Sequence, residues 1–123
     1  MSHDVLDRFG STLMRECRDR AIANALNVIQ GKATAPSLAD IRQLVGSMDD
    51  KSRSVVCDLC IAAIDDVVHE MLFMLAESKE FELRSTAEPT SSLARLSDGL
   101  QGEPFGPRGW IRRFSQYPPA PGS

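Results

Sequence analysis

Apolar residues recur every three or four positions along two long stretches of the chain, which is the spacing of one helix face. The first stretch covers roughly residues 4–30 and ends at Gly31, a residue type that often terminates helices. Its apolar residues form one group over residues 6–17 and another over residues 22–29, which point in different directions on an ideal helix. We expect one long helix that either bends across residues 15–20 or turns its two halves toward different neighbours.

The second stretch is the best-defined element and should run from a cap at Ser47, Asp49 or Asp50 to about Lys79. Its apolar residues fill about half of the helix circumference, which is more than one neighbouring helix covers. This helix would be ~45 Å long, whereas a compact chain of this length is ~35 Å across. We therefore expect a homodimer with a four-helix core. The competing interpretation is that the C-terminal residues fold back over the apolar surface.

The remaining segments are shorter. A short helix is expected near residues 38–46, and the alternation at Phe81 and Leu83 leaves open a small β-hairpin near residues 81–103. Residues 104–123 hold five of the seven prolines and four of the seven aromatic residues. The predicted fold is all-α, with two long antiparallel helices plus short helices in a single domain. A helical body (residues 1–103) carries a Pro/Gly/aromatic lid (residues 104–123).

Composition restricts the function classes only broadly. The 123 residues carry 14 basic and 17 acidic side chains, a net charge of −3, which argues against a general affinity for nucleic acids or anionic membranes. No run of ~18 uncharged apolar residues predicts a membrane span, and the charged start MSHDVLDRF is unlike a signal peptide. Three cysteines, an odd number, suit a reducing compartment, so we expect a cytoplasmic protein.

The charges are unevenly distributed along the chain. Residues 49–82 carry nine acids and three bases, a net of −6, whereas residues 104–123 carry three arginines and no acid. On the long helix, a narrow apolar stripe that includes Ala62 interrupts the polar face and is flanked by acids. Such a stripe suits the docking of a basic, aromatic-bearing element. The predicted partner-binding residues are Val55, Asp58, Leu59, Asp65, Asp66, Glu70 and Phe73.

Three elements could cover this stripe: the chain's own residues 104–123, which we call the tail, a foreign basic protein, or residues 81–103 as ordinary packing. The leading hypothesis is a dimeric, non-enzymatic protein-binding module with an acidic helix face that captures a basic partner. In size and charge the chain is similar to bacterial toxin-neutralising immunity proteins and to regulatory subunits. No cofactor is expected, because no phosphate-binding loop or cofactor motif occurs.

The tail has its own pattern. Trp110, Phe114 and Tyr117 lie at i, i+4 and i+7, with Arg112 and Arg113 beside them, which predicts a short helix that anchors the tail in the core. The same mixture of arginine and aromatic residues is also used to bind single-stranded nucleic acids, and that alternative requires an exposed Trp110.

Metal chemistry is the other alternative class. Cys57 and Cys60 form a CxxC pair to which Cys17 could add a ligand, but sulfurs inside an apolar helix face favour inert core thiols. Asp66 and His69 have the i, i+3 spacing of di-iron helices without the second motif. A divalent-metal site loosely resembling that of MazG-like nucleotide pyrophosphohydrolases would use Glu16, Asp19, Asp66 and Glu70. It requires these carboxylates to converge within ~5 Å.

Overall fold

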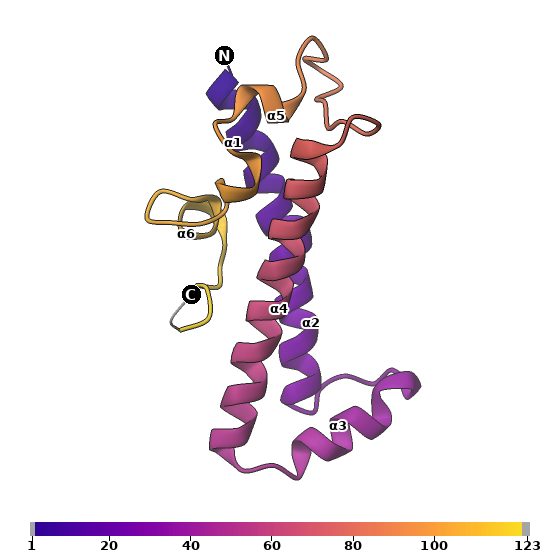
Figure 1. Ribbon diagram of the computed structural model, residues 1–123. Helices are drawn as coiled ribbons and strands as arrows, with labels where there is room; N and C mark the ends of the chain where they lie inside the picture. Colours follow the sequence, from indigo (N-terminus) through magenta and orange to yellow (C-terminus); the bar gives the residue numbers. More distant parts are fainter. Residues whose placement is uncertain (1, 122–123) are drawn as a thin grey trace.

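The computed structural model describes residues 2–121 and is all-α, as predicted, with no strand among those residues. Two long helical stretches run antiparallel side by side, α3 crosses one end, and the C-terminal segment lies along one side (Figure 1). The elements are α1 (Ser2–Leu13), the π-helical turn η1 (Met14–Arg18), α2 (Asp19–Ile29), the 3₁₀ turn η2 (Pro36–Leu38), α3 (Ala39–Gly46), α4 (Asp50–Glu77), α5 (Leu93–Leu96), the 3₁₀ turn η3 (Leu100–Gly102) and α6 (Trp110–Phe114). None of the helices in this part of the chain is long and apolar enough to cross a bilayer.

The first long stretch is one helix with a π-helical turn in its middle. The backbone N–H of Asp19 donates to the carbonyl of Met14, five residues earlier, so one extra residue is inserted into the helix. This insertion rotates every later side chain by about 100°. It moves the buried position from Cys17, which is exposed, to Arg18, which is buried. After the turn, α2 packs mainly against α4 and α3, whereas α1 packs mainly against α5 and α6, so the two halves of the first stretch face partly different neighbours.

The second long helix has the predicted position and cap. The Asp49 carboxylate accepts the backbone N–H of Ser52 at 2.7 Å, which satisfies one of the free donors of the first turn of α4. This hydrogen bond holds the pKa of Asp49 below its usual value. Val68 and Leu72 are buried against the first helix, and the opposite side of α4 is open.

No β-hairpin forms near residues 81–103. The alternating Phe81 and Leu83 lie in an extended loop, and one backbone hydrogen bond, from Leu93 N–H to the Leu83 carbonyl, ties that loop to α5. Leu83 packs partly against the core while Phe81 is exposed, so a single apolar side chain fixes this segment. One anchored residue and one bond are too little to pair two strands.

The C-terminal segment is held in the core by Trp110. The side chain of Trp110 is fully buried and meets the ring of Phe9 edge-on, with the ring centroids 5.8 Å apart. It lies directly over Gly10, where an added Cβ would come within 2.5 Å of the indole. Gly10 therefore provides the space in α1 that the tryptophan occupies. Residues 122 and 123 of the predicted tail lie outside the described residues.

Candidate functional site

The predicted partner-binding residues, Asp65 excepted, lie on the solvent side of α4 along its length. The apolar members are well exposed: Val55 by 61%, Leu59 by 66% and Phe73 by 43%. The acids Asp66 and Glu70 are exposed and Asp58 is half-buried. We call this surface, Val55, Asp58, Leu59, Asp66, Glu70 and Phe73, the outer face.

Asp65 is not part of that surface. Its carboxylate is buried and accepts two hydrogen bonds from Arg18, at 2.6 Å from Nε and 3.1 Å from Nη2. On a helix, Asp65 and Asp66 point 100° apart, so one carboxylate turns inward and its neighbour outward. The sequence pattern predicted that both acids flank the exposed apolar stripe, and for Asp65 that prediction is wrong.

Arg18 joins the two long helices to the C-terminal segment. Besides the two bonds to Asp65, its guanidinium donates to the Ser115 hydroxyl (2.7 Å) and to the carbonyls of Tyr117 (2.6 Å) and Pro118 (3.3 Å). All five N–H groups of this buried side chain therefore have acceptors. Sequence reasoning missed this role because Arg18 stands within a run of charged residues. The available signal was the change of apolar phase at that run, which marks the π-helical turn.

A cavity of about 540 Å³ lies between α4 and the C-terminal segment. Its lining is mostly apolar, with Ala62 and the buried Asp65 on the α4 side and Phe105, Ile111 and three prolines on the other, where Arg112 also lines it. Asp58 and Asp66 lie four residues before and after Ala62, so they neighbour this lining residue along the helix. The cavity and the outer face thus adjoin at Ala62, although no residue of the outer face lines the cavity itself.

The pyrophosphohydrolase-like metal site is not assembled. Asp19 is buried and accepts the Ser115 hydroxyl and the backbone N–H of Gln116, while Glu16 is exposed on η1. Neither joins Asp66 or Glu70 in a metal-ligating group among the described residues. The π-helical turn is the physical reason, because it rotates Asp19 toward the C-terminal segment.

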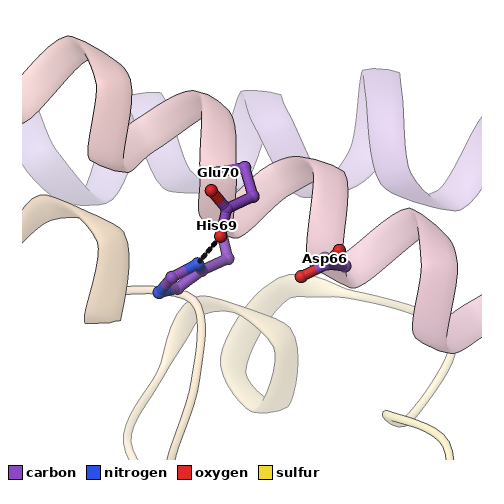
Figure 2. A group of neighbouring side chains, drawn as sticks. All are labelled: Asp66, His69 and Glu70. Carbon is purple, nitrogen blue, oxygen red and sulfur yellow. Dashed lines mark hydrogen bonds and ion pairs between the residues drawn. The ribbon is translucent and has the colours of Figure 1, made fainter.

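One cluster of potential ligands does occur on α4. Oxygen and nitrogen atoms of Asp66, His69 and Glu70 lie within 4.8 Å of one another. Figure 2 shows His69 and Asp66 projecting toward the C-terminal segment, with His69 Nδ1 3.1 Å from Glu70 Oε1. The His69 ring also stacks on Phe73 and lies 6.1 Å from the Phe105 ring. These contacts place His69 between the outer face and the cavity wall.

The cysteines do not form a metal site in the described part of the chain. Cys17 is exposed, Cys57 and Cys60 are half-buried, and all three are free thiols. Burial raises the pKa of the Cys57 thiol, and the neighbouring Asp58 and Cys60 raise it further. A raised pKa lowers the thiolate fraction, so Cys57 is a poor nucleophile at neutral pH.

The tail residues do not contact the rest of the protein through one helix face, as the sequence predicted. Helix α6 ends at Phe114, so Tyr117 lies beyond it and is held through its carbonyl by Arg18. Arg113 pairs with Asp7 of α1 at 3.0 Å and lies over the Phe114 ring, while Arg112 is exposed. The tail arginines are therefore not docked on the acids of the outer face. The buried Trp110 offers no ring face to a nucleic acid base, which removes the basis of that alternative.

No known protein family, curated protein or solved structure matches this chain. The functional assignment therefore depends on the residues of the outer face and on the adjoining cavity. This surface presents carboxylates, apolar side chains and a recess, which together can bind a segment of another protein.

Proposed function

We propose that this protein is a non-enzymatic interaction module that binds a basic segment of another protein across the outer face. The observation that supports this most is the continuity of exposed acids, exposed apolar side chains and an adjoining cavity along one helix. An isolated acidic face would be ordinary solvated surface. Exposed Leu59 and Phe73 beside a recess are the features of a docking surface.

Charge favours a basic partner. Asp66 and Glu70 project from the outer face with no arginine or lysine paired to them among the described residues, whereas Asp65 is already neutralised by Arg18. Lysine or arginine side chains of a partner would pair with these two acids. Exposed pairs contribute little affinity each, about 0.2–1 kcal/mol, but they accelerate association and make it sensitive to salt.

The cavity supplies the place for an apolar anchor. A recess of about 540 Å³ accommodates one large side chain of a partner, with Phe105 and Ile111 as its apolar lining. Arg112 lines the cavity, and Asp65, the acid that also lines it, is already paired with Arg18, so a lysine is disfavoured there and the partner's basic residues should lie on the outer face. A fitting partner is an amphipathic segment with lysines on one side and an aromatic residue on the other.

The test is a fluorescence anisotropy titration with a labelled amphipathic helical peptide of lysine and leucine that carries one phenylalanine. We expect saturable binding that weakens with rising salt. Reversing two charges with Asp66→Lys and Glu70→Lys removes two attractions and adds two repulsions, which should weaken binding about tenfold or more. Replacing the phenylalanine of the peptide by alanine should also weaken it, by about tenfold.

The matched control reverses two exposed acids away from the outer face, with Glu16→Lys and Asp40→Lys, on η1 and α3. It changes the net charge by the same amount, so it separates local contacts from the overall charge of the protein. Binding within about twofold of wild type is expected for this control. An equal loss of peptide affinity in both double variants, or no saturable peptide binding by the wild type, would contradict the proposal.

A further inference from the structure

The side of the two long helices opposite the C-terminal segment is uncovered. A groove of about 400 Å³ runs there between the first helix and α4, and every lining residue belongs to these two helices. Its surface is apolar, with Leu13, Cys17 and Ala21 on one wall and Ala63, Val67 and Met71 on the other. The one charged lining residue is Arg18, whose five donors are all directed to Asp65 and the tail.

The α4 wall of this groove is itself an apolar ridge. Val67, Met71 and Met74 follow one another at i, i+4 and i+7 on α4 and are exposed by 67%, 37% and 48%. A ridge and a groove that lie side by side on one surface are complementary to each other after a two-fold rotation. A second copy would place its Val67 ridge in the groove of the first, and receive the first copy's ridge in its own.

The surface area of the chain also indicates a missing neighbour. The solvent-accessible area is 8139 Å², whereas a compact monomer of 13.5 kDa has about 6,500 Å². The excess of about 1,600 Å² is larger than the area of about 800 Å² that each partner buries in a stable interface. Two helices about 40 Å long and 10 Å wide, side by side, present a face of about 800 Å².

We propose that a second copy of this chain covers this face, forming a two-fold symmetric dimer with a four-helix core. The groove holds no acid, and its one charged lining residue, Arg18, is fully bonded within the protein, which favours the chain itself over a foreign basic partner. The two surfaces adjoin along α4 but share no residue, so the dimer does not depend on the proposed function. Dimerisation would leave both outer faces open on the outside of the particle.

The experiment is light scattering and sedimentation of the full chain over a range of concentrations. Wild type should have twice the 13.5 kDa mass of one chain. Val67→Glu places a charge in the interface and should raise the dimer dissociation constant by about 100-fold or more. The matched control is Leu59→Glu, since Leu59 is exposed by 66% and Val67 by 67% on the same helix, and this variant should stay dimeric.

Labelling of the Cys17 thiol gives a second readout. In the dimer Cys17 lies in the covered groove, so it should react slowly with a thiol reagent in wild type and at least about tenfold faster in Val67→Glu. A circular dichroism spectrum and peptide binding like those of wild type would show that the variant is folded. A wild type that is monomeric at every concentration, a dimeric Val67→Glu, or equal Cys17 labelling in both proteins would overturn the proposal.

Discussion

The neighbouring residues Asp65 and Asp66 should respond very unequally to the same substitution. Asp65→Asn removes the charge that compensates the fully buried Arg18 guanidinium, whose side chain is 0% exposed. Removing one partner of a buried pair costs about 3–5 kcal/mol. Asparagine keeps the shape and one acceptor, so we expect the lower limit, about 3 kcal/mol. Asp66→Asn changes an exposed carboxylate and should cost less than about 0.5 kcal/mol.

The measurement is thermal unfolding followed by circular dichroism at one fixed protein concentration. A chain of 123 residues has an unfolding entropy of about 0.26 kcal/mol/K, so 3 kcal/mol lowers the Tm by about 12 °C and 0.5 kcal/mol by about 2 °C. A fixed concentration is needed because the Tm of a dimer depends on concentration. Equal Tm values for the two variants would refute the placement of Asp65 against Arg18, and with it the attachment of the tail.

Two further stability predictions follow from local geometry. Gly10→Ala should destabilise by about 1–3 kcal/mol because the new methyl group meets the Trp110 ring, whereas Gly46→Ala, with open space around it, should be neutral or stabilising; chemical denaturation compares the two. The backbone N–H of Ser52 lowers the pKa of Asp49. The stability that this cap contributes is therefore complete above the unfolded pKa of about 3.9 and is lost as the pH falls through the lower pKa of the folded state. Asparagine caps without titrating, so the free energy of unfolding should fall less between about pH 6 and pH 2 in Asp49→Asn than in wild type; an equal fall in both proteins would contradict this.

The helical architecture could be predicted because it depends on local periodicity. The apolar arc of the long helix and the Asp49 cap are visible in a single segment of sequence, and α4 has nearly the expected bounds. The glycine after the first long helix is likewise in place, since Gly31 has a φ of +74°.

The site could be predicted only in part because it depends on one inserted residue. The change of apolar phase near residues 15–20 pointed to the region of the π-helical turn but did not reveal its kind. That turn buries Arg18, which in turn pairs with Asp65 and removes that acid from the outer face. Long-range partners of this type, 47 residues apart in sequence, leave no periodic signal.

The central claim is that basic segments bind along the outer face of α4 and the adjoining cavity. The most direct measurement is a titration of isotope-labelled protein with the lysine–leucine–phenylalanine peptide, followed residue by residue by NMR. We predict saturable shifts at Asp66, Glu70 and Phe73 together with Phe105 and Ile111, and little change on α3. Shifts confined to other surfaces, or none that saturate, would contradict the claim.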